Sequence, residues 1–389
     1  MSGFDGGVVI AGIGITEMSK DSGVSSSALA TQAISMALDD AGLTTADVDG
    51  LVTYETDPTS PFVLAQLLGL PALNWYSTTM SGGGGACATF QDAALAVSTG
   101  QCSHVVVYRA ENLRSGRRFG QGISDSDAGS SQPSLRQVRM YGSVTPAWWG
   151  APAFHRYLHV HGKTNADLAH VVVAARAWAE SNPAARFYGR PFTVDDHQAA
   201  AWVAEPVLRT NDCCLESDGG TAFVVTSAER ARDLKSTPVE IVAAARGMAH
   251  GSTLMQNYYG GHTDGLPDLD VVAANVYQQT GLSSEDFDAA IIYDSFSPLV
   301  PMSLEALGYC GRGEGIDFIA DGNTSPGGRY PVNPNGGQIG EGYLHGFNGI
   351  VEAVRQIRRV SVNQIPGANT VMVTSGPALP TSAMILQGC

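Results

Sequence analysis

Two tyrosines and a histidine are the residues of this sequence whose types and settings could support proton transfer. Tyr343 and His345 lie in the stretch NPNGGQIGEGYLHG (333–346), in which five of the fourteen residues are glycine. Tyr293 ends the apolar run AAIIY (289–293). Both residue types act in general acid–base catalysis. A tyrosine at the end of a strand is also a common half-buried packing residue, so the residues alone leave both interpretations open.

The sequence after the glycine-rich stretch predicts a helix over 343–358. Its apolar residues recur at helical spacing: Phe347, Ile350, Val351, Val354 and Ile357. This start would place Tyr343 at the helix N-terminus, where the dipole and free N–H groups favour a phenolate. A phenol of ordinary pKa, ~10, is a poor base at neutral pH, so Tyr343 would need this effect to act as one. The glycines would let the backbone approach a ligand closely.

Composition excludes several classes of function. The 389 residues carry a net charge of −15, which argues against a nucleic-acid partner. Six cysteines show no CxxC spacing, and no apolar run approaches 18 residues. The opening MSGFDGG has no signal-peptide character. We therefore expect a cytoplasmic enzyme with reduced thiols and no membrane span.

A bound metal is not expected. His155 and His159 have the i, i+4 spacing of a zinc-binding helix, and His161 follows closely. The glutamate that such a helix carries between its histidines is absent, and no third ligand is evident. Structural histidines are the interpretation that we favour.

An internal repeat organises the chain. The stretch ALDDAGLTTADVDGLVTYE (37–55) matches VYQQTGLSSEDFDAAIIYD (276–294) at a constant offset of 239 residues, and Tyr54 falls opposite Tyr293. Each copy contains a helix end, a glycine, a capping signal and an apolar strand. We predict two duplicated α/β halves, residues 1–235 and 236–389, with an inserted loop region at about 114–205 in the first half.

The elements that would position the candidate residues alternate along the chain. Buried strands are predicted at 7–15, 104–111, 238–247 and 369–376, and helices at 26–41, 86–99, 165–180, 268–280 and 343–358. This alternation predicts helix-covered sheets. The polar stretch 114–137 is rich in glycine and serine, and it predicts a long loop or lid.

Five stretches resemble the thiolase superfamily, in particular its sterol-carrier-protein type. They are VVIAGIGITEM (8–18), GGGGACATFQDAALAVSTGQ (82–101), DCCLESDGGTAFVVTSAERA (212–231), IIYDSFSPLVPMSLEALGYCGRGEG (291–315) and NPNGGQIGEGYLHGFNG (333–349). The resemblance spans essentially the whole chain. It implies the thiolase fold, an α/β arrangement of two duplicated halves in five αβαβα layers, and a dimer.

The departures from the thiolase pattern argue against thiolase chemistry by the usual route. By this resemblance the nucleophilic cysteine would stand near Gly83 or Gly84, and Cys87 lies about one helical turn later. Tyr343 stands in place of the catalytic His, and Tyr293 in place of the His or Asn of the other loop. The stretch TSGPALPTSA (374–383) has no cysteine where thiolases keep an acid/base thiol. Without a thiolate, an acyl-enzyme cannot form by the usual route.

The motifs YDSF (293–296) and GEGYLHG (340–346) resemble the lipid-transfer-protein-type aldolases that cleave steroid side chains. That resemblance implies retro-aldol cleavage of a β-hydroxyacyl-CoA in bacterial steroid and cholesterol catabolism. The reaction would convert a 17-hydroxy-steroid-carboxyl-CoA into a 17-keto steroid and propionyl-CoA. The catalytic residues would be Tyr293, Tyr343 and, with less support, His345. Which tyrosine is base and which is acid stays open.

The same resemblance implies partners and no separate cofactor. CoA would be part of the steroid acyl-CoA substrate. A protein with an OB-fold/zinc-ribbon domain, fused to or associated with a MaoC-like hydratase, would bind a homodimer core to give a heterotetramer.

Further residues are candidates for substrate contacts. Gly83 and Gly84 stand at the nucleophile position, and Tyr258, Tyr259 and His262 (in YYGGH) could form a substrate wall or an ordinary turn. The CoA phosphates could meet Arg114, Arg117 and Arg118, although a solvated loop face is the more common outcome for such a run.

Two other functions remain as alternatives. One is a non-catalytic acyl-CoA- or sterol-binding carrier with a thiolase-like fold. The other is a true thiolase that uses Cys87 after a loop rearrangement. Ionisable residues at both aligned catalytic positions favour the aldolase, because a carrier has no need of them.

Overall fold

A computed structural model of the chain describes residues 4, 7–80, 83–116, 118–119, 142–252, 264–376 and 381–389. Within these ranges one nine-stranded sheet has the order β3-β2-β4-β7-β1-β8-β11-β10-β9. The strands are β1 (Val8–Ile15), β2 (Gly50–Tyr54), β3 (Trp75–Thr79), β4 (His104–Asn112), β7 (Asp218–Ser227), β8 (Val239–Gly247), β9 (Ala289–Ile291), β10 (Thr370–Thr374) and β11 (Thr381–Gly388). The short strands β5 (Trp202–Ala204) and β6 (Leu208–Arg209) pair separately.

The strand pairing repeats in the two halves of the sheet. In the first half β2 runs parallel to β4, and β7 pairs antiparallel with both β4 and β1. In the second half β9 runs parallel to β10, and β11 pairs antiparallel with both β10 and β8. The halves meet where β1 pairs with β8. This duplication confirms the predicted fold class, whereas the boundary at residue 235 stays a prediction.

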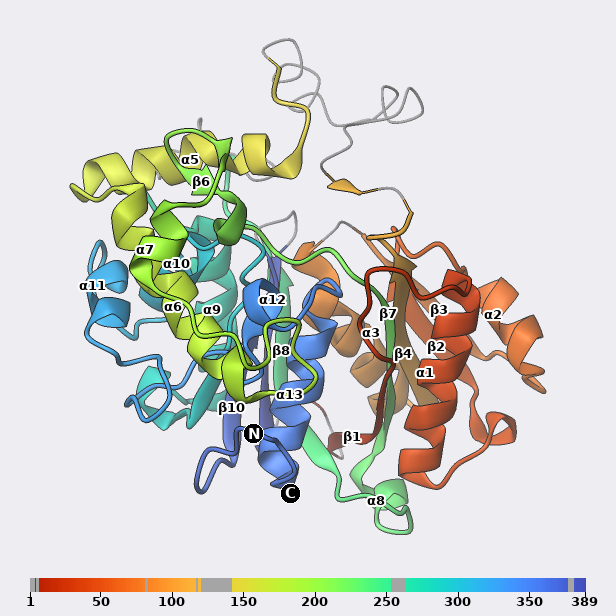
Figure 1. The fold of residues 1–389 in the computed structure, drawn as a ribbon. Coiled ribbons are helices and arrows are strands. Elements are labelled where there is room, and N and C mark those ends of the chain that lie inside the picture. Colours follow the sequence, from red (N-terminus) through yellow and green to blue (C-terminus); the bar gives the residue numbers. More distant parts are fainter. Residues whose placement is uncertain are drawn as a thin grey trace.

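Helices separate and cover the two halves of the sheet in five layers (Figure 1). The central helices, α3 (Ala86–Ser98) and α13 (Phe347–Arg358), share one buried cluster with strands of both halves. On the outer faces lie α1 (Ser26–Ala41) and α2 (Pro61–Leu68) on one side, and α9 (Pro267–Thr280), α10 (Leu299–Ala306) and α11 (Gly315–Ala320) on the other. The alternation along β4 explains the arrangement, since Val105 and Val107 face the central cluster and Val106 faces α1.

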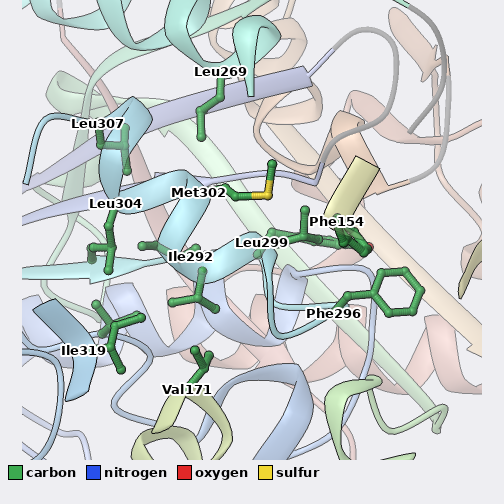
Figure 2. Packing of buried hydrophobic residues seen from close by; sticks show 14 of the residues in the cluster. Phe154, Val171, Leu269, Ile292, Phe296, Leu299, Met302, Leu304, Leu307 and Ile319 are labelled. Atoms are coloured by element: carbon green, nitrogen blue, oxygen red, sulfur yellow. The ribbon is translucent and has the colours of Figure 1, made fainter. Parts of the chain in front are cut away.

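The segment that follows β4 belongs to the first half of the sequence but packs against the second half of the sheet. Its helices α5 (Pro146–Val160), α6 (Asn165–Ser181) and α7 (Val194–Gln198) lie beside the second-half helices (Figure 1). Phe154 of α5 and Val171 of α6 belong to the same buried cluster as Ile292 and Leu299 (Figure 2). The predicted insertion therefore completes the core of the second half.

The predicted strands and helices all occur, with one helix start misplaced. We predicted a helix over 343–358, but α13 begins at Phe347. His345 and Gly346 have φ of 51° and 86°, in the left-handed region that a right-handed helix cannot include. Most of the predicted loop or lid at 114–137 lies outside the described residues. No described helix has the length and apolar character needed to span a bilayer.

Candidate active site

The glycine-rich loop 333–346 is tied to the end of strand β9 by an asparagine. The Asn333 side chain accepts a hydrogen bond from the Ile292 amide (2.8 Å) and donates one to the Ile292 carbonyl (2.8 Å). Farther along, Gly336 has a φ of 102°, and a Cβ there would lie 2.6 Å from the Cβ of Ala179 on α6. Glycine is required here because the loop both turns sharply and touches a helix.

Two buried carboxylates hold the rest of this loop. Asp294 accepts hydrogen bonds from the amides of Gln338 (2.8 Å) and Ile339 (3.3 Å), at the start of the short helix α12 (Gly337–Gly340). Glu341 accepts from the side chains of Asn335 (2.5 Å) and Asn348 (2.8 Å). Burial raises the pKa of Asp294 to about 6 and that of Glu341 to about 7. These contacts fix the backbone that carries Tyr343 and His345.

The loop brings Tyr343 against Tyr293, with their hydroxyl oxygens 2.8 Å apart. Both side chains are buried, and burial raises both pKa values above the ordinary value of 10. Our expectation of a Tyr343 phenolate at a helix N-terminus is therefore wrong. Tyr343 lies four residues before the start of α13, and its burial disfavours the phenolate.

The ring of Tyr293 fills the space above Gly83. A Cβ at Gly83 would lie 2.3 Å from the Tyr293 hydroxyl oxygen, and Cβ atoms at Gly376 and Gly346 would lie 2.7 and 2.9 Å from carbons of the ring. Three glycines from three segments thus make room for one phenol. The tyrosine hydroxyl occupies the position where a side chain of residue 83 would begin.

Gly84 is placed differently from Gly83. Its carbonyl accepts a hydrogen bond from the Ser382 hydroxyl (2.5 Å), which ties the start of α3 to strand β11. Of the two glycines predicted near the nucleophile position, Gly83 faces the Tyr293 hydroxyl and Gly84 contributes a backbone anchor.

His345 completes the cluster beside the two tyrosines. Its ring centroid lies 4.8 Å from that of Tyr343. Its Nδ1 atom lies 2.7 Å from Glu111 Oε1 and 3.1 Å from Arg109 Nη2. Burial lowers the pKa of His345 below the ordinary value of 6.5 against the opposing attraction of Glu111, so the ring is neutral at neutral pH. The structure thus brings all three predicted catalytic residues together.

Three charged residues behind His345 were missed from the sequence. Arg109 and Glu111 are two residues apart on strand β4, so their side chains lie on the same face of the sheet and form an ion pair. Arg109 also pairs with Asp57, with Nη1 and Oδ2 3.1 Å apart. All three side chains are buried. The signal was present in HVVVYRAEN (104–112), where two charges interrupt an otherwise apolar strand. A charge in a buried strand requires a partner.

The other predicted contacts have mixed outcomes. Tyr258, Tyr259, His262 and Arg117 lie outside the described residues. The side chain of Arg118 is engaged by Glu216. Arg114 donates its backbone amide to Asp218 at 2.9 Å. Contacts to CoA phosphates therefore stay a prediction.

Cys87 is a buried core residue at the start of α3. Its Sγ lies 3.6 Å from the Val373 carbonyl, and burial raises the pKa of the thiol to about 12. A protonated, enclosed thiol is a poor nucleophile. Among the described residues no group of three His, Cys, Asp or Glu side chains is arranged to hold a metal ion.

Comparison with known proteins places this geometry in a family. The family described as thiolase C-terminal domain-like matches residues 267–387. A relative from Thermomonospora curvata, named steroid side-chain-cleaving aldolase, is 48% identical, with 99% of each chain covered. A relative from Mycobacterium tuberculosis, named 17-hydroxy-3-oxo-4-pregnene-20-carboxyl-CoA lyase, is also 48% identical, over 98% of this chain and 99% of its own.

Solved structures agree with this placement. The structure of a protein named Ltp2-ChsH2(DUF35) aldolase matches with a TM-score of 0.93 at 47% identity, over 98% of both chains. The acetyl-CoA acetyltransferase from Syntrophomonas wolfei shares the fold, with a TM-score of 0.72 at 16% identity over 99% of this chain and 100% of its own. The suspected resemblance and the thiolase fold are confirmed. The chain belongs to the family of steroid side-chain-cleaving aldolases within the thiolase superfamily.

Proposed function

We propose that this protein catalyses the retro-aldol cleavage of a steroid side-chain CoA thioester in bacterial steroid catabolism. Its substrate would be a 17-hydroxy-steroid-carboxyl-CoA, and its products a 17-keto steroid and propionyl-CoA. The observation that carries the proposal is the hydroxyl of Tyr293 standing over Gly83, bonded to Tyr343 and adjacent to His345. In this proposal the site holds proton carriers at the position that the resemblance gives to a thiolase nucleophile. The names of the two relatives at 48% identity support the substrate class.

The reaction needs two proton transfers and no redox change. A base removes the proton from the β-hydroxyl group, and the oxygen lone pair forms the ketone carbonyl. The bond between the α- and β-carbons breaks, and its electron pair moves into the thioester as an enolate. An acid then protonates the α-carbon and releases the shortened acyl-CoA. No cofactor beyond the CoA of the substrate enters this balance.

We assign the base role to His345 and the acid roles to the tyrosines. His345 is neutral at neutral pH because burial lowers its pKa, so it is able to accept the hydroxyl proton. Tyr293 and Tyr343 remain protonated because burial raises their pKa values. One of the two O–H groups is donated within the pair, and the other would donate a hydrogen bond to the enolate oxygen and then supply the proton to the α-carbon.

The partner would be a protein that contains a domain of the DUF35 type, with an OB-fold and zinc ribbon. The similar structure at 47% identity bears a name that joins such a domain to the aldolase. We propose that two copies of each chain form a heterotetramer around a homodimer of this chain, and that the partner is fused to or associated with a MaoC-like hydratase.

A direct assay tests the proposed function. The chain, co-expressed with the DUF35-type partner, is incubated with a 17-hydroxy-steroid-carboxyl-CoA, and the 17-keto steroid and propionyl-CoA are quantified by mass spectrometry. We expect both products in equal amounts, and a fall of about a hundredfold or more in kcat for Tyr343→Phe.

Tyr277→Phe provides the matched control. The Tyr277 hydroxyl donates to the Leu307 carbonyl, outside the site, so this variant should retain turnover. Binding of the thioester without any product would favour the non-catalytic carrier.

A further inference from the structure

We infer that Glu111 is a positioning residue, which fixes the proton of neutral His345 on Nδ1 and leaves Nε2 free to accept the proton of the substrate. This inference rests on the base role proposed for His345. Its basis is the buried chain of contacts that runs from His345 through Glu111 and Arg109 to Asp57.

The contact between His345 and Glu111 determines the tautomer. Glu111 Oε1 lies 2.7 Å from His345 Nδ1. An ionised carboxylate only accepts hydrogen bonds, so a contact this short requires the hydrogen on Nδ1. Burial would raise the pKa of Glu111, but the attraction of Arg109 and His345 outweighs it, and the pKa lies below the ordinary value of 4.5. Glu111 is therefore ionised at neutral pH.

Arg109 fixes the orientation of the Glu111 carboxylate. Its Nη2 donates to Glu111 Oε2 at 2.6 Å, and its Nη1 donates to Asp57 Oδ2 at 3.1 Å. Asp57 in turn accepts hydrogen bonds from the backbone amides of Ala110 and Thr59, each at 2.9 Å. Arg109 Nη2 also lies 3.1 Å from His345 Nδ1. Nδ1 could accept a hydrogen bond from Arg109 or donate one to Glu111. We assign the bond to Glu111, because it is the shorter of the two contacts, at 2.7 Å, and its acceptor is charged.

The charges of the cluster favour proton uptake by His345. Asp57 and Glu111 contribute two negative charges and Arg109 one positive charge, all on buried side chains. One negative charge is therefore left uncompensated while His345 is neutral. When His345 takes a proton from the substrate, the cluster becomes neutral, which stabilises the state that follows deprotonation.

Aromatic rings hold the plane of His345. The Tyr54 ring lies 5.7 Å from the His345 ring and at 79° to it, and the Phe119 ring lies 5.9 Å away at 83°. Tyr343 covers another side at 4.8 Å. The Nδ1 atom of the imidazole is therefore held at Glu111, and with the proton on Nδ1 the Nε2 atom is the acceptor of the ring.

Glu111→Gln isolates the effect of the carboxylate. Because Arg109 Nη2 is a donor, it selects the amide oxygen of the new side chain and turns the amide NH₂ toward His345 Nδ1. Nδ1 must then accept, which moves the imidazole proton to Nε2 and removes the base. We expect kcat to fall by about a hundredfold or more, with KM changed little. The rising limb that His345 gives to the pH–rate profile should disappear with it.

Glu305→Gln is the matched control. Glu305 is also a buried carboxylate, and it accepts hydrogen bonds from the Tyr157 hydroxyl (2.5 Å) and the Gly315 amide (3.0 Å), outside the site. This variant tests the general effect of replacing a buried carboxylate by an amide. It should retain the turnover and the pH profile of the natural chain.

The decisive measurement is ¹⁵N NMR of the complex of this chain with its partner, labelled on histidine, with His345 assigned by its loss in His345→Asn. We expect the Nδ1–H tautomer in the natural chain and the Nε2–H tautomer in Glu111→Gln. An Nε2–H tautomer in the natural chain overturns the inference, even if Glu111→Gln fails to fold. Normal turnover of a folded Glu111→Gln overturns it as well.

The two proposals fail in different ways. If the natural chain shows the Nδ1–H tautomer but cleaves no steroid thioester, the proposed function is wrong while the positioning of His345 by Glu111 holds. If it cleaves the substrate with the Nε2–H tautomer, the function stands and the positioning role is wrong.

Discussion

Burial and neighbouring charges set the protonation states of the two tyrosines, His345 and Glu111. Tyr293 and Tyr343 are neutral phenols because burial penalises their anions, and His345 is a neutral imidazole because burial penalises its cation. Glu111 stays ionised because Arg109 offsets its burial. The site would therefore offer one base and two acids at neutral pH, the combination that the proposed retro-aldol reaction requires.

The pH dependence of the rate follows from His345. A base acts when it is deprotonated, and the pKa of His345 is lowered from 6.5. We expect kcat/KM to rise with pH, with its midpoint below pH 6.5, and to be level around pH 7 to 8. The profile should be measured with the natural chain and with His345→Asn, which should lack the limb. A rising limb near pH 10 would instead assign the base role to a tyrosine.

Gly83→Ala tests the steric fit of Tyr293. The added methyl carbon would lie 2.3 Å from the Tyr293 hydroxyl oxygen, so the ring must shift and its hydrogen bond to Tyr343 must lengthen. Overpacking of this kind costs about 1–3 kcal/mol of stability, and we expect kcat to fall by about a hundredfold. Turnover and thermal unfolding should be measured together.

Cys87→Ala is the comparison for that variant, because Cys87 is buried at the start of the same helix but lies apart from the tyrosine pair. Its turnover should be close to that of the natural chain. Loss of cleavage in a folded Cys87→Ala would revive the thiolase mechanism.

At the scale of elements, the glycine-rich loop 333–346 depends on its attachment to the end of strand β9. Asn333→Ala removes both hydrogen bonds to Ile292 and leaves its buried backbone groups unpaired. We expect a loss of about 2–4 kcal/mol in the free energy of unfolding, the combined effect of two such groups. Denaturant titration measures it, and Asn333→Asp, which keeps the acceptor but places a carboxylate oxygen against the Ile292 carbonyl, should be destabilised as well. Equal stability of all three chains would contradict this role.

The elements were largely predictable, because apolar runs and helical spacing are local properties. The start of α13 was not predictable, because the residue type of His345 does not indicate that its φ is 51°. Such a conformation is held by tertiary contacts, here the hydrogen bond to Glu111.

Tyr293 and Tyr343 were singled out because the resemblance to thiolases sets both at positions of catalytic residues. The chain from Glu111 to Asp57 was not, because it depends on strands β2 and β4 lying side by side. Residue 345 is 234 positions from its partner Glu111. Local sequence patterns carry no information about such a contact.

At the scale of the whole molecule, one edge of the sheet is suited to self-association. Strand β3 is the terminal strand, and Phe62 of α2 and Tyr76 of β3 form an exposed aromatic pair with ring centroids 4.6 Å apart. Leu67 of α2 is also exposed. We predict a homodimer through this edge, because exposed apolar clusters of this kind mark interfaces.

Light scattering should give twice the mass of one chain at micromolar concentration. Phe62→Glu together with Tyr76→Glu should weaken the dimer by about tenfold or more, because charges would be buried at the interface. Val360→Glu, an equally exposed apolar position in the segment after α13, serves as the control and should leave the mass unchanged. A stable monomer of the natural chain would contradict the prediction.

The contact between Gly83 and Tyr293 also makes the two positions interdependent. A side chain at residue 83 and a phenol at residue 293 would require the same space, since the Cβ and the hydroxyl oxygen would be 2.3 Å apart. In this backbone a cysteine at residue 83 and a tyrosine at residue 293 are therefore mutually exclusive. A variant that restores a side chain at residue 83 would have to shorten residue 293 as well.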